Sequence, residues 1–269
     1  MSTKTLSITN LIGVIAVIFF NYYLNAQGIN GNTVGSLSDE YSNLFTPAGY
    51  AFSIWGIIFL ALFVQAIFLV VRAFKPQKDQ TPISQIGLGI FLANLLNIGW
   101  LIAWLNEYTG MSVVVMLLLL ITLLSVVVRT NMERWDAPLK IIAFIWWPIC
   151  LYSGWIAVAT IANISALLAK IGWTGGIAES TWALIMISVA TLLGILMIFK
   201  RNMREFSMVI VWALIAIAVR HWGEIPLLQY GSVAGAIVLL GVSSYHASQN
   251  LATMPFKKKW NEEEEVVAD

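Results

Sequence analysis

The stretch MSVVVMLLLLITLLSVVV, residues 111–128, decides the fold class because all eighteen of its residues are uncharged. A helix of that length rises about 27 Å, close to the roughly 30 Å hydrocarbon core of a bilayer. Polar residues bound the stretch, with Asn106–Gly110 before it and Arg129 after it. This pattern predicts a helix that spans a membrane.

Seven further apolar stretches accompany this one, so the chain is expected to be an all-α, polytopic membrane protein with eight transmembrane helices. Hydrophobic residues make up 59% of the chain and charged residues 11%, whereas soluble domains carry about 25% charged residues. Such stretches can form buried helices in a soluble protein, but eight in succession argue against that alternative. The other expected helices cover residues 6–26, 48–71, 86–105, 141–168, 182–199, 206–219 and 233–246.

The basic residues show which side of the membrane each gap faces. Of the 15 Lys and Arg residues, all but Lys170 and Arg220 fall on alternate gaps. Cytoplasmic loops are enriched in Lys and Arg, so the pattern predicts a multi-pass protein of the inner (cytoplasmic) membrane with both termini in the cytoplasm. The first stretch could be mistaken for a signal peptide, but removing it would leave an odd helix count and a worse charge pattern.

The longest gap on the outer side is Gly28–Pro47, which is polar and contains no Lys or Arg. We expect it to cover a cavity as a lid; the alternative is a solvated connector. Basic residues in the tail, residues 255–269, favour anionic headgroups, so membrane lipids are expected partners. The net charge of +1 gives no reason to expect nucleic-acid binding.

Two expected helices, residues 86–105 and 141–168, each carry a stripe of aromatic and amide side chains at helical spacing. If the stripes face each other, they line an apolar pocket with a few hydrogen-bonding groups, as small-molecule sites do. Alternatively, the amides bond between helices and the aromatic rings only pack. The first stripe holds Asn94, Asn97 and Trp104 with Trp100 beside it, and the second holds Tyr152, Trp155, Ala159 and Asn163.

Other features of the 141–168 stretch concern packing. Its many small residues predict either close packing within the bundle or a homodimer interface, and Pro148 predicts a kink. Cys150 lies in mid-helix and is expected to be a small buried hydrophobe. The sequence shows no Cys/His metal cluster, nucleotide loop or Ser–His–Asp set. We therefore expect no metal, no required cofactor and no enzymatic activity, with a membrane enzyme acting on a pigment or lipid as the weakest alternative.

A group of ionisable residues, Arg220, His221 and Glu224, follows the 206–219 stretch near the predicted outer face. An Arg–Glu ion pair at the membrane surface is one explanation. The alternative is a small-molecule secondary transporter in which these residues lie near the substrate or proton path. His246 is predicted at the opposite face, so the two histidines are not expected to share a metal or haem.

Three blocks resemble the tryptophan-rich sensory protein family, whose mitochondrial branch is the translocator protein (peripheral benzodiazepine receptor). Residues 45–52, FTPAGYAF, followed by Trp55, are similar to the family's Pro-Pro-Gly-Trp-Val-Phe block, although Tyr50 replaces the usual Trp. Residues 94–100, NLLNIGW, are similar to its Leu-Asn-Leu-Leu-Trp block. Trp155, Ala159 and Asn163 match a Trp-x-x-x-Ala-x-x-x-Asn pattern.

The resemblance covers roughly residues 5–168. It implies a five-helix translocator-protein-like bundle over residues 1–168, three additional helices over 169–254 as in a longer divergent branch, and the charged tail. It further implies a pocket inside the bundle, covered by the loop after the first helix. The expected ligand-binding residues are Tyr50, Trp55, Asn97, Trp100, Trp104, Tyr152, Trp155, Ala159 and Asn163.

Family members resemble one another as membrane receptors or carriers for porphyrins and, in mitochondria, for cholesterol and drug-like ligands. The resemblance thus implies a receptor, sensor or carrier that binds an apolar planar ligand, either tetrapyrrole-like or sterol-like. Such a ligand would stack on Trp and Tyr faces while Asn97 or Asn163 orients its polar edge.

Overall fold

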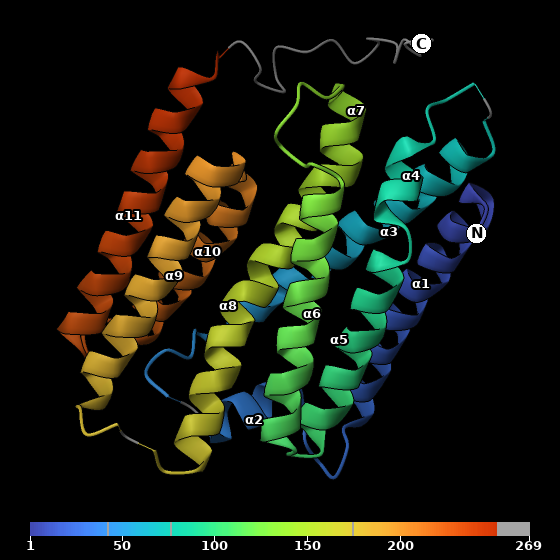
Figure 1. Cartoon of the computed structure of the whole chain (residues 1–269). Coiled ribbons are helices and arrows are strands. Elements are labelled where there is room, and N and C mark those ends of the chain that lie inside the picture. Colours follow the sequence, from blue (N-terminus) through green and yellow to red (C-terminus); the bar gives the residue numbers. More distant parts are fainter. Residues whose placement is uncertain (42, 76, 174, 252–269) are drawn as a thin grey trace.

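The computed structural model describes residues 1–41, 43–75, 77–173 and 175–251, and this part of the chain is helical apart from loops and one isolated bridge between Ile29 and Asn32. Eight long helices run up and down (Figure 1). The start of α1 and the end of α11 lie at one end of the molecule. The long helices are α1 (Thr3–Gln27), α3 (Ile54–Ala73), α5 (Gly89–Leu105), α6 (Thr109–Arg129), α8 (Trp147–Lys170), α9 (Glu179–Arg201), α10 (Arg204–Arg220) and α11 (Pro226–Gln249).

Five short elements complete the described fold. They are α2 (Val34–Glu40), the 3-10 segment η1 (Gly49–Ser53), α4 (Thr81–Ile86), α7 (Leu139–Ile141) and the π-helical segment η2 (Ile142–Trp146). Two of them, α2 and η1, lie in the connection between α1 and α3. This connection is at the end of the molecule opposite the start of α1 (Figure 1).

Among the described helices, six are long and apolar enough to cross a membrane, which supports a multi-pass membrane protein but does not confirm eight spans. The two remaining long helices, α5 and α10, have 17 residues each. In α5 the expected stretch is interrupted near its start. In α10, Arg204 and Glu205 occupy the first turn and Arg220 the last, which shortens the apolar part.

The interruption before α5 lies at Gly87, whose φ of 57° is readily reached only by glycine. The backbone groups freed by this break are satisfied by the amide of Asn10 on α1. Its Nδ2 donates to the carbonyl of Gly87 at 2.7 Å, and its Oδ1 accepts from the N–H of Phe91 at 2.8 Å. The break is thus stable in an apolar interior because α1 supplies the missing partners.

The most buried of the candidate spans is the helical run from α7 through η2 to α8. In its apolar 18-residue stretch 78% of the residues are buried, against 33–39% in the other candidate spans. A π-helical turn, η2, directly precedes α8 and Pro148, while the expected kink at Pro148 stays a prediction. Gln65 of α3 donates to the carbonyl of Ile145 in this turn at 2.9 Å. An inserted turn is thereby tied to a neighbouring helix.

Helices α9, α10 and α11 pack side by side, and α10 packs against α8 (Figure 1). The two backbones approach closely at Gly154, where an added Cβ would lie 2.9 Å from the carbonyl oxygen of Phe206. At this point the small residues of α8 serve packing within the chain. The expected homodimer and the division at residue 168 stay predictions.

Candidate functional site

A cavity of about 60 Å³ lies under the connection between α1 and α3. We call residues 28–47 of this connection the lid, as the sequence analysis did. The lid contributes Val34, Ser38, Tyr41, Thr46 and Pro47 to the cavity, and the rest of the wall comes from η1, α3, α5 and α8. The expectation that this loop covers a cavity agrees with the structure.

The lid folds locally through short-range hydrogen bonds. Thr33 caps α2 by accepting from the N–H of Ser36 at 3.1 Å, and Ser36 Oγ in turn accepts from the N–H of Thr33 at 2.8 Å, which forms a capping box. Two lid side chains, Leu37 and Phe45, are fully or almost fully buried. The lid is therefore packed on the bundle and is not a solvated connector.

Six of the nine predicted ligand-binding residues line this cavity. The other three lie elsewhere: Tyr50 is 43% exposed, and Asn97 and Tyr152 are buried in the bundle beneath the cavity wall. Contact with a ligand stays a prediction for all nine. The six wall residues are Trp55, Trp100, Trp104, Trp155, Ala159 and Asn163.

Six of the fifteen wall residues are aromatic, and several of their rings contact one another. Trp100 and Trp104 are stacked, with ring centroids 6.2 Å apart and an interplanar angle of 16°. Trp155 meets both Trp55 and Phe52 edge to face, at 6.3 and 6.1 Å. Ring pairs of this kind are favourable beyond their buried area, so the wall is ordered before any ligand arrives.

The amide of Asn163 is committed to the protein. Its Oδ1 accepts from the indole N–H of Trp100 at 2.8 Å, and its Nδ2 donates to Ser112 Oγ on α6 at 2.9 Å. The indole N–H of Trp104, a wall residue only 5% exposed, has by contrast no partner among the described residues. The Asn163 amide is therefore bonded within the protein, and the unpaired donor on Trp104 is buried within the wall.

The amide of Asn97 also bonds between helices, because its Oδ1 accepts from Asn21 Nδ2 of α1 at 2.9 Å. Beside it, Tyr152 donates to the carbonyl of Ala93 at 3.5 Å and contacts the Trp55 ring edge to face at 6.1 Å. Tyr50 contacts Trp212 of α10 in the same manner at 5.4 Å. In this structure these three residues support the wall and η1.

Charged residues fasten the first part of the lid to the α5–α6 turn. Tyr41 donates to a carboxylate oxygen of Glu107, and Asn32 donates to the other at 3.2 Å. Lys170 lies 3.7 Å from the same carboxylate and 4.7 Å from the centre of the Tyr41 ring. The hydrogen bond from Tyr41 lowers the pKa of Glu107, and the same bond raises the pKa of Tyr41 to about 12.

Helix α10 fastens the second part. His221, which is buried, donates from Nε2 to the carbonyl of Leu44 at 2.9 Å. Arg220 donates to the carbonyl of Pro47 at 3.3 Å and lies 3.6 Å from Asp39. The expected Arg220–Glu224 pair is wrong, because Arg220 pairs with the lid and Glu224 is exposed.

No sequence pattern indicates the contacts of Arg220 and His221 with the lid, since two of them reach backbone carbonyls. Two of the three residues assigned to the transporter alternative, Arg220 and His221, are engaged with the lid. This arrangement does not favour a transport path through them. Lys170 and Arg220, the two exceptions to the charge pattern, are both explained as lid contacts.

A second hollow, of about 580 Å³, adjoins the cavity between α1 and α3. Asn21, Tyr22 and Asn25 of α1 line its far side. The residues that border both spaces are Val34, Pro47, Phe52, Trp55 and Trp100. The small cavity is thus separated from a much larger space by a few side chains.

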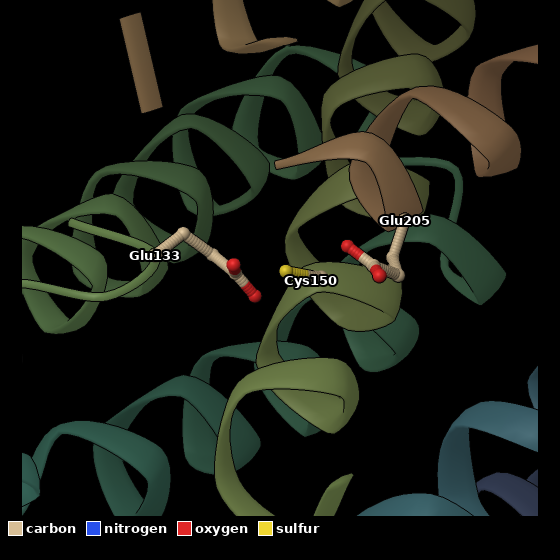
Figure 2. A group of neighbouring side chains, drawn as sticks. All are labelled: Glu133, Cys150 and Glu205. Carbon is tan, nitrogen blue, oxygen red and sulfur yellow. The ribbon is translucent and has the colours of Figure 1, made fainter. Parts of the chain in front are cut away.

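A separate group of possible metal ligands lies nearer the other end of the bundle. Figure 2 shows the thiol of Cys150 between the carboxylates of Glu133 and Glu205, and their donor atoms all lie within 4.8 Å of one another. Asn202 donates to Glu133 at 3.5 Å. No sequence motif indicates this group, because its members come from distant segments, and the expected absence of a metal stays a prediction.

The comparisons with known proteins concern nearly the whole chain. A family model described as TSPO-like protein matches residues 7–245. The match continues past the five-helix region in which the three motifs lie and ends within α11. The curated proteins and the solved structures gave no match. Because the family model covers far more than half of the sequence, the chain belongs to the TSPO-like protein family.

Proposed function

We propose that this protein is a membrane receptor, sensor or carrier that binds an apolar planar ligand in the cavity under the lid. The observation that carries the proposal is the wall itself: four Trp rings surround the space, and the indole N–H of Trp104 has no partner among the described residues. Apolar sites with a few placed polar groups are typical of small-molecule binding. A binding function requires no catalytic group and no metal.

The size of the cavity places a condition on the proposal. Sites for drug-sized ligands enclose roughly 300–1,000 Å³, far more than the 60 Å³ found under the lid. A ligand must therefore displace side chains of the lid or η1 and use space from the adjoining hollow.

Within this class, a tetrapyrrole is our first proposal and a sterol the second. Four indole rings favour a flat aromatic molecule. The buried Trp104 N–H, which has no partner among the described residues, would donate to an oxygen at the edge of a ligand that displaces neighbouring side chains. From the charge pattern we also propose the inner membrane as its location, with cytoplasmic termini, and membrane lipids as its surroundings.

The test is a titration of the detergent-solubilised protein with protoporphyrin, followed by quenching of Trp fluorescence and corrected for absorption by the ligand. We expect saturable quenching, a large loss of affinity in Trp155→Ala, and a smaller loss in Trp104→Phe, which removes only the N–H donor. Trp222→Phe is the control, because Trp222 is 66% exposed and remote from the cavity wall. Unsaturable quenching that Trp155→Ala leaves unchanged would exclude this ligand; competition by cholesterol tests the sterol.

A further inference from the structure

Five residues border both hollows, namely Val34 and Pro47 of the lid, Phe52 of η1, Trp55 of α3 and Trp100 of α5. Phe52 is half-buried and touches Trp155 edge to face at 6.1 Å. Trp55 and Trp100, which also border both spaces, belong to regular helices of the bundle. A displacement of η1 would therefore join the spaces without breaking a helix.

Helix α10 holds the backbone of η1, in addition to the bonds by which η1 continues into α3. The indole N–H of Trp212 donates to the carbonyl of Ala51 at 3.1 Å. Immediately before η1, the N–H of Ala48 donates to the carbonyl of Ala216 at 3.1 Å. Both α10 residues lie on one helical face, four positions apart.

The same face of α10 continues toward the lid. One turn beyond Ala216, Arg220 donates to Pro47 and His221 to Leu44, both at backbone carbonyls. Four residues of the segment 44–51, namely Leu44, Pro47, Ala48 and Ala51, therefore bond to α10 or to His221 directly after it. Such bonds fix the position of the backbone whatever side chains it carries.

Resting on the proposed function, we propose that α10 controls ligand access to the cavity by restraining η1, with Trp212 as the chief positioning residue. When the Trp212–Ala51 bond opens, Phe52 moves aside and the cavity joins the hollow between α1 and α3. The ligand then arrives from that side. The three C-terminal helices thereby contribute to binding without touching the ligand.

The experiment measures access directly and uses no ligand. In a full-length Cys150→Ala background, Ala159→Cys places one thiol on the cavity wall, and its labelling by N-ethylmaleimide is timed. We expect Trp212→Phe to speed labelling by about threefold to tenfold, because it removes one hydrogen bond and keeps an aromatic ring against Tyr50. Trp222→Phe, in the exposed turn that follows α10, should leave the rate unchanged.

Thermal melting in detergent checks that each variant is folded. Arg220→Gln, which weakens the contact with Pro47, gives a second folded variant with a smaller expected increase. Equal labelling rates in the parent, Trp212→Phe and Arg220→Gln would overturn the proposal. So would an equal increase in Trp222→Phe, since that would indicate general loosening of α10.

The proposal and the ligand assignment fail in different ways. Faster labelling in Trp212→Phe together with unsaturable porphyrin quenching keeps the restraint by α10 and removes porphyrin. Saturable quenching with unchanged labelling keeps the ligand and removes the restraint. When both hold, Trp212→Phe should also raise the rate of porphyrin association more than it changes the equilibrium affinity.

Discussion

The two halves of the lid are held by unlike contacts. Near Tyr41 the contacts are ionic and open to solvent, with the Glu107 and Lys170 side chains 42% and 30% exposed. Near residues 44–51 the contacts are hydrogen bonds to backbone carbonyls, and the His221 donor is only 4% exposed. Exposed charge pairs contribute little and respond to salt and pH, whereas a buried group left without its partner is costly. The α10 side should therefore dominate lid stability.

The largest expected effect comes from His221→Phe, which removes a buried donor and leaves the carbonyl of half-buried Leu44 without it. We expect the free energy of unfolding to fall by about 1–3 kcal/mol, measured as a lower melting temperature in detergent. His246→Phe is the matched control, because His246 lies near the other end of α11 and away from the lid. If the two variants melt alike, the buried half is not the stronger one.

A smaller effect is expected from Tyr41→Phe, which removes the donor to Glu107 on the exposed half. The loss should be at most about 1 kcal/mol because both groups are partly solvated. Hydrogen exchange of the lid amides is the sensitive measurement, and Tyr108→Phe, an exposed tyrosine in the same turn region, is the control. A loss as large as that of His221→Phe would contradict the comparison.

The exposed half should also respond to acid. Binding to the lid lowers the pKa of Glu107 below its ordinary 4.5, so its stabilising contribution is complete above the ordinary value and is lost as pH falls through the lowered one. Tyr41, whose pKa is about 12, stays protonated over this range. Amide protection of residues 33–41, corrected for intrinsic exchange, should drop on acidification in the parent.

Glu107→Gln supplies the comparison for that measurement. It lacks the carboxylate, so its lid protection should be lower at neutral pH and should not depend on pH in this window. Protection around residues 44–51, held by α10, should be much less sensitive to the same change of pH. A pH response confined to residues 44–51 would reverse our assignment of the two halves.

The smallest expected effect is that of Asp39→Asn. The Asp39 side chain is 75% exposed, and its oxygen lies 3.6 Å from Arg220. Exposed pairs of this kind contribute about 0–1 kcal/mol, so the melting temperature should hardly change. Arg220→Gln should cost more, because Arg220 also donates to the carbonyl of Pro47. Equal effects would mean that the ion pair, not the backbone bond, carries the contact.

The sequence predicted the helices well because apolar length is a local property. The expected helix at 111–128 corresponds to α6, and the expected helix at 141–168 corresponds to the run α7, η2 and α8. The sequence missed the break at Gly87, whose stability depends on Asn10 about 80 residues earlier in the chain. The sequence predicted eight spans, whereas length and composition support six. The two helices that fall short are α5, which begins after the break at Gly87, and α10, whose first and last turns carry charged residues.

The cavity was predictable only as far as side-chain periodicity reaches. Trp155, Ala159 and Asn163 repeat at steps of four, and the structure places all three on the wall. Nothing in the sequence distinguishes the bonded N–H of Trp100 from the unpaired one of Trp104, since that depends on whether Asn163 lies within reach. Contacts from α10 to lid carbonyls leave no pattern in the sequence at all.

The amides of Asn10 and Asn21 bear on how the chain is built into the bilayer. Each bonds to α5 or the turn before it, 76 or 77 residues further along the chain. During synthesis α1 therefore leaves the ribosome well before these partners exist. Each amide also donates to a carbonyl of its own helix, Leu6 for Asn10 and Val17 for Asn21, at 3.0 and 2.9 Å.

Those local bonds let α1 insert with one amide hydrogen of each side chain already satisfied, which reduces the cost of carrying polar groups into lipid. The second hydrogen is used only when α5 arrives. Helix α1 thus keeps a docking position for α5, and the order of synthesis is also the order in which the two asparagines acquire their partners.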